Sequence, residues 1–119
     1  MCLAATISSL VREHRAKPYV DGVNDCLTFV LDVLNLKFGC AITRFEFIES
    51  GHLLFRKVAS PIEGDVIMFR LKDKWHIGYA LDCEFFIHKH AILGVIQTRL
   101  RNQIFSRSLE GIYRLNSHD

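Results

Sequence analysis

Residues 23–36 read VNDCLTFVLDVLNL and place a cysteine between a polar pair and a mostly apolar run. Either Asn24 or Asp25 can cap the free N–H groups of a helix that covers residues 26–38. Apolar side chains surround this helix almost completely, which predicts that it is buried in the centre of the domain. Gly39 follows at the usual position of a C-terminal cap.

The segments on either side are also predicted to be helical. Upstream, apolar residues and His14 recur at helical spacing over residues 3–15, and Pro18 disfavours any continuation of that helix. Downstream, residues 43–51 (TRFEFIESG) are consistent with a short third helix that ends at Gly51.

After these helices the apolar period changes to two, which is typical of strands. Branched and aromatic residues are enriched in five segments, which we expect to be strands: residues 65–71, 75–81, 84–89, 93–100 and 111–115. Most connections between them are short and favour antiparallel pairing. The sequence therefore predicts a single α+β domain over residues 1–119, with N-terminal helices packed on a five-stranded antiparallel sheet.

The composition is that of an ordinary globular domain, with 119 residues, 50% hydrophobic and 24% charged. A net charge of +2 is too weak to favour a nucleic-acid partner, and we expect Arg99, Arg101 and Arg107 to form a solvated face. No apolar stretch is long enough to predict a membrane span, and no secretory signal is recognised. Cys2, Cys26, Cys40 and Cys83 are widely scattered, so we expect mostly reduced thiols.

Cys26 is the first candidate for chemistry. The unpaired N–H groups and the dipole at a helix start favour a thiolate there, which is the attacking species in acyl transfer. Its neighbours in sequence supply no base, so a partner must come from elsewhere in the fold. The alternative is that Cys26 is simply a buried structural residue.

Two histidines in KWHIGYALDCEFFIHKH (residues 74–90) could supply that partner. A hairpin that turns at Asp82 brings His76 and His88 to the same face and the same end of adjacent strands. One imidazole could then act as the base while the other holds it in the correct tautomer. Either histidine alone would more simply be a hydrogen-bonding residue of the core.

The order PYVDGVNDC, GDVIMFR, WHIGYAL and FIHKH resembles the NlpC-type cell-wall cysteine peptidases, which have a papain-like fold. The resemblance covers about residues 17–98 and implies that Cys26 is the nucleophile, His76 the base and His88 the orienting residue. It also implies that Tyr19 helps to stabilise the oxyanion, with the Cys26 N–H as a second donor. Leu27 and Thr28 depart from the small or aromatic residue and glycine that often follow the cysteine in the family.

The resemblance implies a cysteine peptidase that hydrolyses an amide bond in peptidoglycan stem peptides and needs no cofactor. Compact domains of this kind resemble peptidases of phage tail tips. We therefore expect a virion tail with other tail-tip proteins as partners, or otherwise the cytoplasm. A catalytically idle tail or adaptor module remains a rival, as does another acyl-transfer enzyme such as an amidase toxin, a deamidase or an acyltransferase.

Two further expectations concern the remaining cysteines and histidines. A zinc site is an alternative use of the candidate residues, and its possible ligands are Cys26, His76, His88, His90 and Cys83. His14, His52 and His118 have no matching partner in the sequence, and we expect them to be surface or capping residues.

Overall fold

A computed structural model describes residues 3–118 of the chain and contains four helices and six strands in that range. The helices are α1 (Leu3–Ala16), α2 (Cys26–Phe38), α3 (Arg44–Leu54) and α4 (Gln103–Arg107). The strands are β1 (Phe55–Val58), β2 (Val66–Leu71), β3 (Lys74–Ala80), β4 (Phe85–His90), β5 (Gly94–Arg99) and β6 (Leu109–Leu115).

The strands form one antiparallel sheet in the order β1-β6-β2-β3-β4-β5. The α+β class and the layered architecture are therefore confirmed, although the sheet has six strands where five were predicted. Strand β1 was missed, and α4 lies within the segment that was predicted to be an extended connection.

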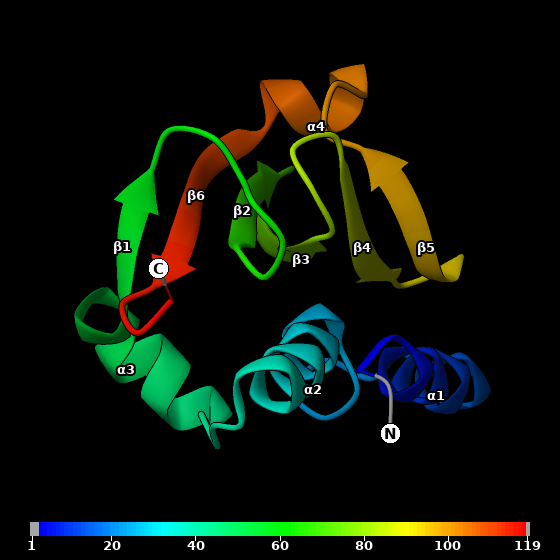
Figure 1. Cartoon of the computed structure of the whole chain (residues 1–119). Coiled ribbons are helices and arrows are strands. Elements are labelled where there is room, and N and C mark those ends of the chain that lie inside the picture. Colours follow the sequence, from blue (N-terminus) through cyan, green and yellow to red (C-terminus); the bar gives the residue numbers. More distant parts are fainter. Residues whose placement is uncertain (1–2, 119) are drawn as a thin grey trace.

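Helix α2 is the central element, as predicted. It lies against one face of the sheet, with α1 beside it and α3 toward the β1 end (Figure 1). Asp25 is the N-cap and accepts a hydrogen bond from Thr28 N–H, while Gly39 ends the helix with a left-handed φ of 63°. Helix α2 packs mainly on β3 and β4. Its fully buried side chains, which include Phe29, Val30, Val33 and Leu34, belong to one core cluster with buried residues of the sheet.

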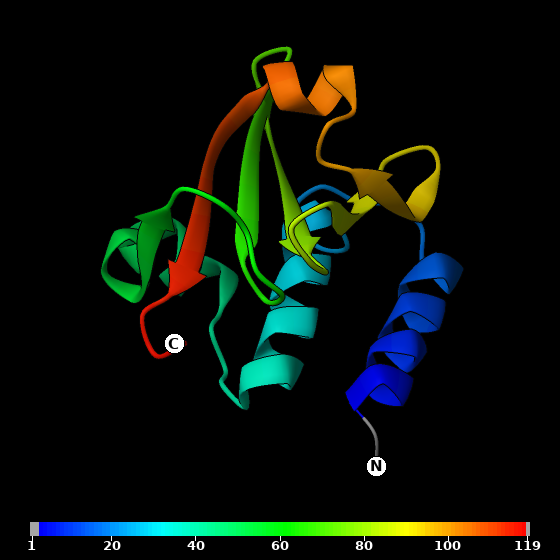
Figure 2. The same ribbon diagram turned by 45° about the horizontal axis from the view of Figure 1, so that its top comes forward.

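The opposite face of the sheet carries a second, smaller core. Ile67, Phe69, Ala80, Phe86 and Ile112 are buried there, and Phe105 of α4 packs against them. Figure 2 shows α4 placed away from α1 and α2, across the sheet. Side chains alternate between the two faces of a strand, so this second face also carries His76 and His88.

His14 is a correction to the sequence analysis, because it is only 2% exposed and is not a surface residue. Its ring packs edge-on against Phe29, and its Nε2 lies 2.8 Å from Asp32 Oδ2, so it fastens α1 to α2. His52 is exposed, as expected. His118 is half-buried and donates to the Glu63 carbonyl in the loop before β2, so it is neither a surface residue nor a helix cap.

The Gly-Asp motif before β2 places Asp65 at a structural position. This carboxylate is fully buried, accepts two hydrogen bonds from the Arg114 guanidinium and also accepts one from Ile62 N–H. A buried carboxylate needs this degree of pairing to offset its lost hydration. The ion pair between Asp65 and Arg114 ties the start of β2 to β6, next to the candidate site.

Among residues 3–118, no helix combines the length and apolar character needed to cross a membrane.

Candidate active site

Cys26 occupies the first turn of α2, where the chain is held by several hydrogen bonds. The Asp25 carboxylate caps the helix at Thr28 N–H and also accepts from Gly22 N–H in the preceding turn. Arg44 of α3 donates to the same carboxylate at 2.5 Å and to Thr28 Oγ1 at 2.9 Å. Burial raises the pKa of Asp25, but its hydrogen bonds from Arg44, Thr28 and Gly22 outweigh that effect and lower it. Asp25 therefore stays ionised beside the cysteine.

The Cys26 thiol itself is nearly buried, with 7% of the residue exposed. The Tyr19 hydroxyl donates to Cys26 Sγ at 3.6 Å. Burial raises the pKa of the thiol, and the charge of Asp25 adds to that rise, against the opposing effect of the Tyr19 hydrogen bond. The helix start by itself favours a thiolate, whereas burial and the charge of Asp25 favour the neutral thiol and raise its pKa.

His76 and His88 are in direct contact, as the spacing predicted. His76 Nε2 lies 2.7 Å from His88 Nδ1, and the ring centroids are 4.9 Å apart. The register differs from the prediction, because Tyr79 pairs with Ile87 and Ala80 with Phe86. The hairpin is thus centred on Cys83 rather than Asp82, and the two histidines meet diagonally.

Both imidazoles are neutral near pH 7. Burial, together with the charge of His90, lowers the pKa of His76 to about 4. Burial lowers the pKa of His88 to about 3, with further contributions from His76 and His90. A neutral His76 whose Nε2 faces His88 leaves Nδ1 as the ring nitrogen available to the pocket.

An aromatic enclosure surrounds the two histidines and accounts for their burial. The Phe86 and Phe105 rings lie 4.7 Å and 5.0 Å from the His88 ring, measured between centroids. The remaining His88 nitrogen, Nε2, lies 2.9 Å from Thr98 Oγ1 on β5. The sequence analysis did not identify Phe105, Thr98 or Arg44 as site residues, since each comes from an element whose position depends on the whole fold.

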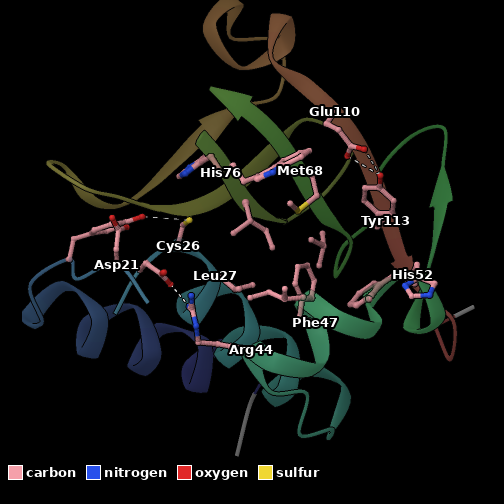
Figure 3. A pocket seen from close by; sticks show the side chains of 18 residues that line it. Asp21, Cys26, Leu27, Arg44, Phe47, His52, Met68, His76, Glu110 and Tyr113 are labelled. Atoms are coloured by element: carbon pink, nitrogen blue, oxygen red, sulfur yellow. Dashed lines mark hydrogen bonds and ion pairs between the residues drawn. The ribbon is translucent and has the colours of Figure 1, made fainter. Parts of the chain in front are cut away.

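Tyr19, Cys26 and His76 line one pocket of about 760 Å³, into which α2 and β3 project from opposite sides (Figure 3). His88 lies behind His76 and is not among the lining residues. No hydrogen bond joins Cys26 to His76 in the part of the chain that the structure describes. The pocket continues past Leu27 between α3 and the sheet, where its lining residues include Phe47, Phe55, Val66, Met68 and Tyr113.

The other cysteines and histidines do not join this group. His90 Nδ1 accepts from the N–H groups of Ile92 and Leu93 in the turn that follows β4. Cys83 is exposed, and Cys26, Cys40 and Cys83 are free thiols, while Cys2 lies outside the described residues. Within residues 3–118, no three His, Cys, Asp or Glu side chains are arranged to hold a metal ion.

Comparison with known proteins shows what the fold is similar to. The crystal structure of a protein described as similar to a lipoprotein of the NLP/P60 family, from Staphylococcus aureus subsp. aureus Mu50, aligns with a TM-score of 0.71 and 18% identity. The alignment covers 95% of this chain but only 41% of that one. No protein-family model and no curated protein matches the sequence. The chain therefore has an NLP/P60-like fold, as the sequence analysis predicted.

Proposed function

We propose that this chain is a cysteine peptidase that hydrolyses an amide bond in peptidoglycan stem peptides. The observation that carries the proposal is the single pocket lined by Cys26 and His76, with His88 hydrogen-bonded behind His76 at 2.7 Å. A nucleophile, a base and an orienting group are the parts that amide hydrolysis requires. The similarity of the fold to an NLP/P60 structure supports the same reaction class.

The raised pKa of Cys26 and the lowered pKa of His76 favour a neutral resting pair. His76 Nδ1 therefore takes the thiol proton as Sγ attacks the carbonyl carbon, and His76 then gives that proton to the departing amine. The product of this step is a thioester on Cys26. Water, deprotonated by His76, attacks the thioester and releases the carboxylic acid and the free thiol. Tyr19 O–H and the Cys26 N–H stabilise the negative oxygen in both steps.

The setting that we propose is a phage tail tip, where other tail proteins would hold the enzyme against the wall. This part rests on the resemblance of the sequence motifs to compact tail-tip peptidases. Antibody labelling of phage particles, if the gene lies in a phage genome, would test it. Absence of the protein from purified tails would contradict this setting.

The reaction is tested by incubating purified sacculi with the wild-type protein and with Cys26→Ala and His76→Ala variants. We expect the wild type to release fragments with new free amine termini, detected by mass analysis of the muropeptides. Either substitution should reduce the release by at least about a thousandfold. Thermal melts of the variants control for folding. A wild-type protein that releases nothing from any wall type would favour the catalytically idle tail or adaptor module.

A second candidate function is favoured by the apolar part of the pocket. Beyond Cys26 its walls are mostly hydrocarbon and aromatic, and the volume of about 760 Å³ is within the range of small-molecule pockets. A peptide backbone placed there would lose hydration without gaining matching partners, whereas an alkyl chain would lose nothing. This observation supports acyl transfer from a substrate with an apolar acyl group, through the same Cys26 thioester.

Gly51 offers a direct test of this second candidate. It lines the pocket from α3, and a Cβ built on it meets no atom within 4 Å. Gly51→Trp would therefore fill the apolar region, and Gly51→Ala would leave it open. The measurement is acylation of Cys26 by p-nitrophenyl esters with acyl chains of two to twelve carbons. We expect the wild type and Gly51→Ala to prefer long chains, and Gly51→Trp to lose that preference. Equal rates for all chain lengths in the wild type would reject this candidate.

A further inference from the structure

His88 makes a second hydrogen bond that the proposed reaction does not yet use. Its Nε2 lies 2.9 Å from Thr98 Oγ1, on the neighbouring strand β5, and His88 itself is 0% exposed. Together with the contact between His76 and His88, this bond makes a continuous chain from the pocket to β5. The chain ends at Thr98, which is half-buried.

We propose that Thr98 is a positioning residue that accepts a hydrogen bond from His88 and thereby sets the tautomer of His76. The inference rests on the proposed roles of Cys26 and His76. Thr98 contacts neither of those residues in the described hydrogen bonds, so it would act only through His88.

Two arrangements of hydrogens satisfy the chain. In the first, His76 Nε2–H donates to His88 Nδ1, and His88 Nε2–H donates to Thr98 Oγ1. His76 Nδ1 then carries a lone pair and is able to accept the thiol proton. In the second, every bond is reversed: Thr98 O–H donates to His88, His88 donates to His76, and His76 Nδ1 carries a hydrogen. Only the first arrangement leaves His76 Nδ1, in the pocket that Cys26 also lines, with a lone pair that can accept a proton.

The surroundings of Thr98 allow the first arrangement. Thr98 lines a small surface pocket with Arg99, Arg101 and Asn102, so its own hydroxyl hydrogen can be donated to water. His88 Nε2, in contrast, lies in the aromatic enclosure with Phe86 and Phe105 beside the ring. A buried N–H without an acceptor loses its hydration and gains no hydrogen bond in return, which is costly. The Thr98 oxygen removes that cost and stabilises the arrangement with a free lone pair on His76.

The test compares Thr98→Val, which keeps the shape of the side chain without its hydroxyl, with Thr98→Ser, which keeps the hydroxyl. Nitrogen-detected NMR of the histidine rings reports the tautomers directly and needs no activity. We expect Nε2–H tautomers of both His76 and His88 in the wild type and in Thr98→Ser. In Thr98→Val, His88 should shift toward the Nδ1–H tautomer. An unchanged His88 tautomer in Thr98→Val, or an Nδ1–H tautomer in the wild type, would overturn the inference.

The rate of Cys26 acylation by p-nitrophenyl acetate gives the second readout. Thr98→Val should be about tenfold slower, the effect of losing one hydrogen bond of about 1.4 kcal/mol, and Thr98→Ser should recover at least half of the wild-type rate. Equal rates in Thr98→Val and the wild type would overturn the proposed role. If the wild type releases p-nitrophenol no faster than its Cys26→Ala variant, the rates of the Thr98 variants carry no information about Thr98. The expected tautomers would then support Thr98 as a positioning residue, and the missing activity would reject the proposed function.

Discussion

His76 contacts His88 diagonally across the β3–β4 hairpin. Because Tyr79 pairs with Ile87, the residue directly opposite His88 is Gly78. A Cβ on Gly78 would lie 2.6 Å from Cδ2 of Phe86, which is 0% exposed. The absence of a side chain at residue 78 therefore lets the Phe86 ring lie across β3 and against the His88 ring. This arrangement gives a physical reason for the glycine two residues after His76.

Gly78→Ala is accordingly expected to destabilise the protein and to disturb the histidine pair. Overpacking of a buried site costs about 1–3 kcal/mol, and Phe86 has no room to move without displacing His88. Urea unfolding measures the stability, and acylation of Cys26 measures the activity. Gly51→Ala is the matched control, because its Cβ meets open space on a helix, and it should be neutral or slightly stabilising. Equal stability of the two alanine variants would contradict this account.

The pH profile of acylation should reflect the burial of His76. Its pKa is lowered to about 4, so the base stays neutral, and the rate stays high, well below the usual histidine value of 6.5. The raised pKa of Cys26 places the alkaline limb of the profile above the ordinary thiol range. We expect the acylation rate to reach a plateau at about pH 5 and to stay there at higher pH. The rate is measured by intact mass spectrometry between pH 3.5 and 8, and circular dichroism verifies the fold at each pH. A half-maximal rate near pH 6.5 would show that His76 is solvated, contrary to the structure.

The stability of the fold should fall with acid for the same reason. His88 has a folded pKa of about 3, below its unfolded value, so the unfolded chain binds protons more readily as the pH drops below 6.5. The stability that neutral His88 provides is thus complete above pH 6.5 and is lost as the pH falls toward 3. The slope is at most about 1.4 kcal/mol per pH unit for one histidine.

Urea unfolding at pH 7 and pH 5 measures this effect in the wild type and in His88→Asn. The variant loses one titrating group and keeps the rest, so its free energy of unfolding should change less between the two pH values. The difference between the two proteins isolates His88 from the carboxylates and the other histidines. Parallel pH dependences would mean that His88 is accessible to protons in the folded state.

Local sequence signals predicted the elements that they fully specify. Asp25 and Gly39 define both ends of α2, and the even spacing of His76 and His88 predicted their shared face. The exact register was not predictable, because Asp82 accepts from the N–H groups of Glu84 and Phe85 and so shapes the turn. That choice between neighbouring turn geometries depends on how Phe86 packs in the finished sheet.

The missed features all depend on distant parts of the chain. Strand β1 has only four residues, two of them charged, and its pairing with β6 crosses more than fifty positions. Helix α4 has five residues, too few for a periodic signal, yet it delivers Phe105 to the histidines. The burial that raises the pKa of Cys26 could not be read from a helix start, which by itself favours a thiolate. His14, in contrast, shared the apolar spacing of α1, and that signal could have predicted its burial.

Arg44 provides a last prediction, about the electrostatics of the nucleophile. Its guanidinium pairs with Asp25, the residue directly before Cys26, whose charge raises the pKa of the thiol. Arg44→Gln would leave that carboxylate without its cation, and an unpaired negative charge acts more strongly on a neighbouring thiol. The pKa of Cys26 should therefore rise further, and its alkylation by iodoacetamide at pH 8 should slow, because only the thiolate reacts.

Arg44→Lys is the matched control, since it keeps the positive charge and should have a smaller effect than Arg44→Gln. The measurement is the rate of iodoacetamide labelling of the Cys26 peptide across pH 7–10, with the exposed Cys83 as an internal reference. An Arg44→Gln profile that coincides with the wild type would mean that water already screens Asp25 from the sulfur. Arg44 would then serve only to hold α3 against the start of α2.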